Sequence, residues 1–270
     1  MKTATAKKKS SGGVYETFKT IIYAILIALV VRTVAYEPFN IPSGSMIPTL
    51  LVGDYLFVSK FSYGYSRFSL PFGLPLFSGR ILEFHKPERG DVAVFKLPTD
   101  TSTDYIKRIV GLPGDKIQMV HGQLFINGQM VPRRQVEDCL SPDGGTTLMH
   151  QYIESLPRGP SEPPLEHRII KIGDDGPLDN TAVYEVPQGY YFAMGDNRDN
   201  SQDSRVISAV GYIPAENLVG RAAFLFFSTD GSAAWWEFWK WPLAIRYSRL
   251  LHGVQGMGPS SPGPAAGRCE

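Results

Sequence analysis

An apolar run near the N-terminus constrains this chain more than any other feature. Between Lys19 and Arg32 the sequence reads TIIYAILIALVV, twelve residues without a charge. That is shorter than the roughly 18 residues expected of a membrane-spanning helix, but the apolar pattern resumes after Arg32 and continues to Tyr36. A helix over residues 15–36 would be about 33 Å long, and the two cations could extend to the lipid headgroups from its ends. The run therefore predicts one membrane anchor, which we place at residues 19–36.

A cleavable signal sequence is the alternative interpretation of this run. An apolar core of this length fits such a signal, and Thr33-Val34-Ala35 resembles a cleavage site of small residues. We favour the anchor because the apolar pattern continues beyond Arg32. Lysines in the basic segment 1–18 precede the run, whereas acidic residues such as Glu37 follow it. This asymmetry places the N-terminus in the cytoplasm and the rest of the chain outside.

The balance of charges and the two cysteines exclude several classes of protein. The chain of 270 residues has 27 Lys+Arg and 26 Asp+Glu, so it lacks the basic surplus typical of nucleic-acid binding. Two cysteines, Cys139 and Cys269, are too few for the usual thiolate metal site or disulfide framework. A Cys139–Cys269 disulfide is one alternative, but we favour unbonded cysteines, because Cys269 lies in a Gly/Pro-rich tail, residues 253–270, that is predicted to be disordered.

Residues 37–252 contain short apolar segments rich in Val, Ile, Tyr and Phe and separated by turn residues. This pattern is typical of antiparallel strands, and Asn127-Gly128 predicts a β-hairpin turn. From residue 136 to 179 the composition shifts to Pro, Gly, Ser and charge, which predicts an insertion within about residues 123–188. The predicted fold is mostly β: an antiparallel sheet domain with an inserted smaller β or irregular subdomain, preceded by one transmembrane helix.

All four tryptophans lie in the segment WWEFWKW, residues 235–241. Core packing is one interpretation. The other is contact with a membrane surface, because Trp favours the depth of the headgroups and the segment also contains charged residues. The sequence leaves both open.

Several familiar catalytic and metal-binding patterns are missing from the sequence. The five histidines lack the HExxH spacing of a zinc site, and the chain has neither a GxxxxGK phosphate loop nor a GxSxG elbow. Residues 199–210 begin like a calcium loop, but they lack Gly at the sixth position and have Val210 where Glu is required. We therefore expect no metal and no cofactor.

Two serines in the segment IPSGSMIPTL, Ser43 and Ser45, suggest either a turn or a nucleophile with a helper. A serine without a histidine can be activated by a neutral lysine amine, provided that apolar surroundings hold the lysine below its solution pKa of about 10.4. A strand in DYIKRIVGLPGDKI would place Lys107 on one face with Tyr105 and Ile109. From the pattern alone, a turn and a solvent-facing lysine are the commoner outcomes, so the pair is a hypothesis at this point.

Four segments, in this order after the apolar run, resemble the conserved boxes of bacterial type I signal peptidases: PSGSMIPTL, GDYLFVSKFSYG, YIKRIVGLPGDK and GDNRDNSQDSR. That family consists of membrane-bound serine proteases with a Ser–Lys dyad. The resemblance covers about residues 20–225, and four extended motifs in order make it specific. It implies hydrolysis of the bond that joins signal peptides to exported preproteins.

The resemblance also implies roles for the matched residues. Ser45 would attack the scissile carbonyl, and Lys107 would take its proton and later give it to the leaving amine. The Ser43 hydroxyl would help the Ser45 backbone N–H to form an oxyanion hole. Ser201 would orient the Lys107 amine, while Asp203 and Arg205 would form a supporting ion pair, unless they are only a solvated surface pair. Subsites for small substrate residues would be lined by Met46, Tyr105 and Ile106.

The implied partners are preprotein signal peptides, the lipid bilayer and the secretion translocon. The implied location is the cell inner membrane, crossed once, with a periplasmic peptidase domain. Some relatives carry a cysteine pair in the insertion, but Cys139 has no nearby mate. Three rival hypotheses are a catalytically inactive membrane-anchored scaffold of the same fold, a soluble self-cleaving repressor-like protein, and a secreted β-rich binding domain.

Overall fold

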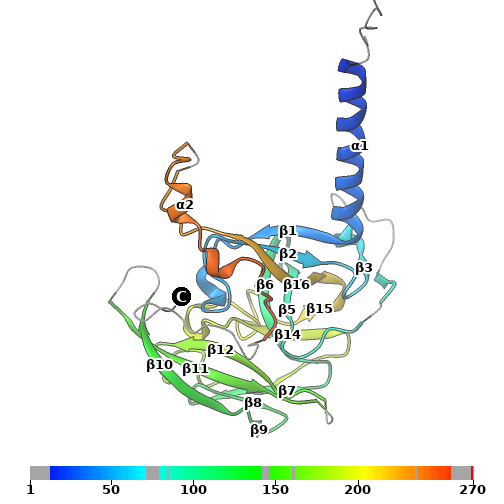
Figure 1. Ribbon diagram of the computed structural model, residues 1–270. Coiled ribbons are helices and arrows are strands. Elements are labelled where there is room, and N and C mark those ends of the chain that lie inside the picture. The colour runs from blue at the N-terminus through cyan, green and yellow to red at the C-terminus, as the bar shows by residue number, and fades with distance from the viewer. Residues whose placement is uncertain are drawn as a thin grey trace, which may run out of the picture.

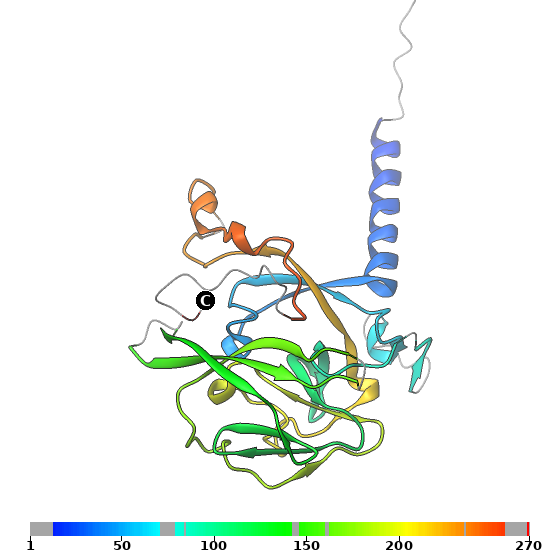
Figure 2. The same cartoon turned by 60° about the horizontal axis from the view of Figure 1, so that its bottom comes forward.

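The computed structural model describes residues 13–70, 79–83, 85–141, 146–159, 162–234, 236–256 and 269. Apart from one long N-terminal helix, the described chain is mostly antiparallel β-sheet, which confirms the predicted fold class. Figure 1 and Figure 2 show this helix standing away from the β domain, with only its C-terminal end joined to a sheet.

Among the described residues, one helix is long and apolar enough to cross a membrane: α1, Gly13–Val34. None of its apolar window is buried within the described structure, and Ile27, for example, is 64% exposed. The helix ends before Tyr36, the predicted limit, because Tyr36 already pairs with Ser59 as the first residue of a strand. Of the predicted basic N-terminus, residues 1–12 lie outside the described residues.

The main sheet has seven antiparallel strands in the order β1-β2-β16-β5-β6-β14-β15. Alternating Val, Ile, Leu and Phe side chains point from these strands into the core, as expected for a half-buried sheet. The bounds of the strands are β1 Tyr36–Asn40, β2 Asp54–Ser59, β5 Val92–Leu97, β6 Asp100–Gly111, β14 Tyr190–Met194, β15 Ile213–Pro214 and β16 Leu218–Ser228.

Two smaller sheets are formed by the residues between β6 and β14. One has the order β13-β7-β8-β9 and the other β10-β11-β12; a further pair, β3 and β4, lies near α1. The β8–β9 hairpin turns at Asn127-Gly128 as predicted, with φ angles of 53° and 79°. The bounds are β3 Tyr65–Ser66, β4 Arg80–Ile81, β7 Lys116–Val120, β8 Gln123–Ile126, β9 Gln129–Met130, β10 Arg133–Leu140, β11 Leu148–Leu156, β12 Leu165–Lys171 and β13 Tyr184–Glu185.

The prediction that the two cysteines would remain unbonded was wrong. Cys139 on β10 and Cys269 form a disulfide across a sequence separation of 130 residues. Both sulfurs are buried in an apolar cluster with Ile47 and Leu51, so the pairing is stabilised by packing that the sequence does not reveal. Part of the predicted disordered tail is also ordered, since Val254 is 4% exposed and belongs to the core. Residues 257–268 and 270 lie outside the described residues.

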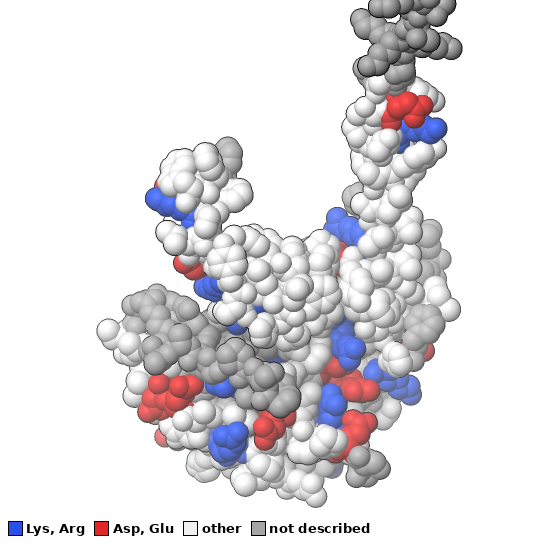
Figure 3. All heavy atoms as spheres, in the orientation of Figure 1, with Lys and Arg blue, Asp and Glu red and all other residues white. Residues whose placement is uncertain are grey.

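The tryptophan-rich segment projects from the β domain around the short helix α2, Trp241–Ala244. Trp236, Trp239 and Trp241 are 60%, 61% and 47% exposed, so core packing is not their role. Trp235 lies outside the described residues. Figure 1 and Figure 2 show α2 and α1 on the same side of the domain, and Figure 3 shows few charges on the surface between them.

Candidate active site

A cleft of about 1210 Å³ opens between the loop that follows β1 and the first half of β6. One wall consists of residues 39–45 and the opposite wall of residues 103–107. Asn197, Asn200 and Gln202 line it from a third side. The cleft therefore brings together the predicted nucleophile segment, the predicted lysine strand and the segment after β14.

Ser45 lies on a single turn of 3-10 helix, Gly44–Met46, at the edge of this cleft. Two hydrogen bonds from Asn197 hold the turn: its backbone N donates to the Ser45 carbonyl at 3.1 Å, and its Nδ2 donates to the Gly44 carbonyl at 3.0 Å. The Ser45 side chain is partly exposed, so a substrate in the cleft can reach its hydroxyl.

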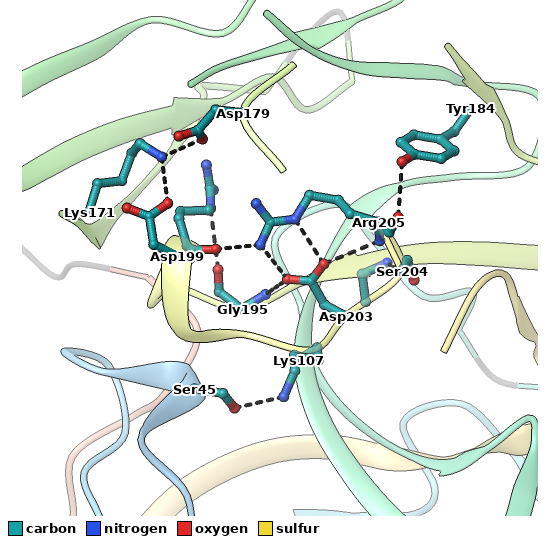
Figure 4. Close-up of polar contacts among 12 residues, drawn as sticks. Ser45, Lys107, Lys171, Asp179, Tyr184, Gly195, Asp199, Asp203, Ser204 and Arg205 are labelled. Carbon is teal, nitrogen blue, oxygen red and sulfur yellow. Dashed lines mark hydrogen bonds and ion pairs between the residues drawn. The ribbon is translucent and has the colours of Figure 1, made fainter. Parts of the chain in front are cut away.

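Lys107 lies on β6 and points toward Ser45, as Figure 4 shows. Its Nζ is 2.7 Å from Ser45 Oγ, and it also donates to the carbonyl of Ile106 at 2.9 Å. The lysine is 4% exposed, with its Nζ 5.2 Å from the centre of the Tyr105 ring. Lys107 is therefore buried and faces Ser45, whereas lysines in such a sequence pattern more commonly face solvent.

Burial lowers the pKa of Lys107 from 10.5 to about 8. The carboxylates of Asp203 and Asp196 act in the opposite direction, because a nearby negative charge favours the ammonium form. Each of these carboxylates is paired with its own arginine, which limits that effect. With a pKa of about 8, roughly a tenth of the amine is neutral at pH 7, so a base is available beside the Ser45 hydroxyl.

Ser43 is exposed at the same cleft, with its Oγ 3.4 Å from Ser45 Oγ. The backbone of Ser43 is extended, at φ −127° and ψ 151°, and it leads directly into the turn that carries Ser45. A hydroxyl in this place can donate to an oxygen that develops negative charge next to Ser45.

Asp203 and Arg205 form a fully buried ion pair next to Lys107 (Figure 4). Arg205 donates from Nε and Nη2 to the two carboxylate oxygens, at 2.9 and 2.8 Å. Burial alone would raise the pKa of Asp203, but Arg205 and the N–H of Gly195 hold it below its usual range. The alternative of a solvated surface pair is wrong, because the side chains are 0% and 1% exposed.

Comparison with known families identifies the fold around this cleft. Residues 14–227 match the family described as signal peptidase, peptidase S26. The chain belongs to this family. It is therefore a peptidase.

Relatives in the family are similar over most of their length. A signal peptidase I of Rickettsia typhi is 43% identical over 232 residues, covering 85% of each chain. One of Rickettsia conorii is 40% identical over 242 residues, covering 88% of each chain. A crystal structure of a signal peptidase I from Enterococcus faecalis is 25% identical and covers 51% of this chain and 97% of the other, with a TM-score of 0.29.

Ser201 of this peptidase does not make the expected hydrogen bond to Lys107. Its Oγ is buried and has no partner in good hydrogen-bond geometry, although it lies near enough to Asp203 to help lower the pKa of that carboxyl. It packs instead against Gly195, where any side chain would overlap Ser201 Oγ and crowd the Ser45 carbonyl. Gly195 is thus required for the close approach of these two serines, and the sequence analysis did not identify it.

Two of the three residues expected to contact substrate line the cleft. Tyr105 and Ile106 belong to its β6 wall. Met46, in contrast, is 0% exposed and packs in the core with Ile41 and Leu50, because the 3-10 turn directs its side chain away from Ser45. Apolar lining that the sequence analysis did not identify comes from Phe39, Ile47 and Leu51.

A network of buried charges under the cleft was also not identified from the sequence. Arg108 donates to both carboxylate oxygens of Asp196, at 2.9 and 2.7 Å. Arg198 pairs in the same bidentate way with Glu154 of β11. The alternating charges of GDNRDN were a signal for such pairs, but the partners lie in other strands.

Within the described residues, no group of three or more His, Cys, Asp or Glu side chains is placed to hold a metal ion. The buried His167 lies among charged groups, 3.5 Å from Glu154 and 3.7 Å from Asp196. Burial and the positive charge of Arg108 lower its pKa to about 4, so His167 is a neutral imidazole at pH 7.

Proposed function

We propose that this peptidase removes signal peptides from exported preproteins, with Ser45 as the nucleophile and Lys107 as the general base. One observation supports this proposal above all others: a lysine with a pKa of about 8 has its Nζ 2.7 Å from the Ser45 hydroxyl. Distance and pKa together meet the requirements for proton transfer near neutral pH. The two Rickettsia relatives described above are signal peptidases I.

The first half of the reaction forms an acyl-enzyme. Neutral Lys107 takes the proton of Ser45 while Oγ attacks the scissile carbonyl carbon. The carbonyl oxygen becomes an oxyanion, to which the Ser45 backbone N–H and the Ser43 hydroxyl donate. As the C–N bond breaks, the Lys107 ammonium gives its proton to the leaving amine, and the mature protein departs with a free N-terminus.

The second half of the reaction is hydrolysis of the ester. Lys107, neutral again, takes a proton from a water molecule, and the hydroxide attacks the ester carbonyl. The bond to Ser45 Oγ then breaks, and Lys107 returns the proton to Oγ. The signal peptide leaves with a new carboxyl group. Asp203 and Arg205 support these steps by keeping charge balanced around the buried amine. Ser201 packs against Gly195, next to the turn that carries Ser45.

The open edges of two strands suggest how an extended substrate binds. Strand β1 pairs with β2 along one edge, and residues 104–107 of β6 pair with β5 along one edge. Among the described residues, no strand covers the other edge of residues 103–107; it faces the cleft, as do residues 39–43. A peptide laid between these edges can form main-chain hydrogen bonds with both. Tyr105 and Ile106 then line shallow apolar subsites, which suit small side chains.

We also propose that the enzyme is a single-pass protein of the inner membrane, with α1 as its anchor and the β domain on the periplasmic side. The Cys139–Cys269 disulfide supports this topology, because such bonds persist in oxidising compartments and are rare in the cytosol. The exposed tryptophans around α2 lie on the side of α1, where they can enter the headgroup region. The bilayer and the translocon are then its partners, together with preproteins.

The test is cleavage of a peptide with an Ala-x-Ala site by the full chain in detergent, for wild type, Ser45→Ala and Lys107→Met. Ser102→Ala and Lys116→Met, which change exposed residues, are the matched controls. We expect wild type and controls to cut after the second Ala, and the two site variants to lose about 1,000-fold or more in kcat. Cleavage by Lys107→Met would show that another group is the base. A folded wild type that never cuts would favour the inactive scaffold.

A further inference from the structure

A segment that lies beyond the matched family region contacts the loop that carries Ser45. The family match ends at residue 227, whereas residues 245–256, here called the strap, run back across β16. Backbone hydrogen bonds fix it there: Leu251 donates to Leu225 at 2.8 Å, and Leu225 donates to His252 at 2.9 Å. The strap is thus hydrogen-bonded to β16 outside the strands of the main sheet, and its inner face lies against the nucleophile loop, residues 41–53.

Two arginines of the strap hold the nucleophile loop by its carbonyl groups. Arg249 Nη2 donates to the Thr49 carbonyl at 3.0 Å, and Arg246 Nη1 donates to the Val52 carbonyl at 3.0 Å. Thr49 is four residues from Ser45. Backbone carbonyls in a loop between a 3-10 turn and a strand have no sheet partner of their own, so these bonds restrict how the loop can move.

Arg249 is itself fixed by a buried carboxylate at the end of the loop. Its Nε and Nη2 donate to the two oxygens of Asp54, at 3.1 and 2.6 Å, and Asp54 is 0% exposed. Asp54 also accepts from the backbone N–H of Leu51 at 2.8 Å and from the Ser228 hydroxyl at 2.7 Å. The planar guanidinium therefore connects the middle and the end of the loop with one rigid fork.

The strap also contacts the strand that carries the base. Gln255 accepts from the N–H of Val92 on β5 at 3.0 Å, and its carbonyl accepts from Nη1 of Arg108, the residue after Lys107, at 2.5 Å. The 2.7 Å distance between Lys107 and Ser45 joins two segments 62 residues apart in sequence. The strap lies against both of them.

We propose that the strap is a positioning element of the active site, and that Arg249 is its main positioning residue. Arg249 itself does not line the cleft, so it contacts neither the bound peptide nor the reacting atoms. Arg249 holds the nucleophile loop in the position in which Ser45 Oγ lies within hydrogen-bond distance of Lys107 Nζ. This inference rests on the proposed function, because it concerns the geometry of that same serine and lysine.

The experiment compares Arg249→Met with Arg89→Met in the full chain, using the Ala-x-Ala peptide. Arg89 is a matched control because it makes the same kinds of contact as Arg249. It donates to a carboxylate, that of Asp115, at 2.9 Å, and to a backbone carbonyl. Asp115 also accepts from the backbone N–H three residues before it, as Asp54 does. Arg89 does not contact the nucleophile loop. We expect Arg249→Met to lower kcat by about 10- to 100-fold with little change in KM, since small misplacements of reacting groups have effects of this size.

Rescue separates positioning from general stability. All rates are measured well below the lowest melting temperature of the set, and Arg249→Lys, which keeps the charge but not the fork, is expected to recover part of kcat. Hydrogen exchange of the Leu51 and Gly53 amides, which are bonded in the loop, is expected to accelerate in Arg249→Met and not in Arg89→Met. Should Arg249→Met fail to fold, Arg249→Lys and Arg89→Lys are compared, and a several-fold loss of kcat in the first alone is expected.

Equal kcat values in the Arg249 and Arg89 variants, with active wild type, would overturn the positioning role and leave the proposed function intact. A wild type that does not cleave the peptide would overturn the proposed function itself. A loss seen only as raised KM would overturn the proposal too, since it would place Arg249 in substrate binding.

Discussion

The buried amine of Lys107 is expected to destabilise the folded protein at neutral pH, and replacing it should reveal this cost. The lysine is 4% exposed, and burial lowers its pKa from 10.5 to about 8. At about 1.36 kcal/mol per pKa unit, this difference corresponds to a cost of about 3 kcal/mol at pH 7. Because the folded pKa is the lower one, the unfolded chain binds more protons between the two values, and stability rises with pH across that interval.

The Lys107→Met variant lacks the titrating group, so its stability relative to wild type depends on pH. Between pH 7 and pH 10 the relative free energy of unfolding should shift by about 2 kcal/mol in favour of wild type, because the folded amine loses its proton while the unfolded amine, with its pKa of 10.5, keeps most of its own. At pH 7 the variant should be the more stable protein, by about 1 kcal/mol after the loss of two hydrogen bonds of about 1 kcal/mol each.

The assay is denaturant unfolding in detergent, followed by far-ultraviolet circular dichroism, for wild type and Lys107→Met at pH 7 and pH 10. Circular dichroism is preferred because the three described tryptophans, Trp236, Trp239 and Trp241, are largely exposed and would report poorly on unfolding of the core. Lys116→Met, at a side chain that is 60% exposed, is the control and should show no comparable shift. A stability difference between Lys107→Met and wild type that is the same at both pH values would refute the argument that the amine is desolvated.

Two further predictions concern the support of the site. Asp203→Asn leaves the buried Arg205 without its carboxylate and should lower the free energy of unfolding by about 3–5 kcal/mol. Because the pKa of Asp203 is lowered in the folded protein, this loss of stability should be complete above a pH of about 4 and should become smaller in more acidic solution. A loss of stability that becomes larger in acid would contradict the ion pair. Reduction of the Cys139–Cys269 disulfide, which closes a loop of 130 residues, should lower stability by about 2–5 kcal/mol. The melting temperature with and without reductant measures this, with Cys139→Ser/Cys269→Ser as the insensitive control, and equal values for wild type would contradict it.

Features that depend on neighbouring residues were predictable from the sequence. The apolar run gave the position of α1, alternating apolar residues gave most of the strands, and Asn127-Gly128 gave the β8–β9 turn, because each depends on local conformational preference. The segments that form the cleft could also be located, since Ser45 and Lys107 lie in extended motifs. The sequence did not predict their distance or the burial that lowers the pKa of Lys107.

Features that depend on residues far apart in the chain could not be predicted. The disulfide joins residues 130 positions apart, and the Arg108–Asp196 pair joins residues 88 positions apart. Neither pairing has a local pattern, because the partners meet only after the sheets have packed. The placement of Met46 was not predictable for another reason: one turn of 3-10 helix decides whether a side chain next to Ser45 enters the cleft or the core.

The pH dependence of kcat/KM for the Ala-x-Ala peptide tests the central claim most directly, namely that neutral Lys107 activates Ser45. With a pKa of about 8 for Lys107, kcat/KM should rise about tenfold per pH unit below that value and level off above it, because only the neutral amine can accept the proton. A profile that is flat between pH 6 and 9, measured on enzyme that stays folded throughout, would contradict the account.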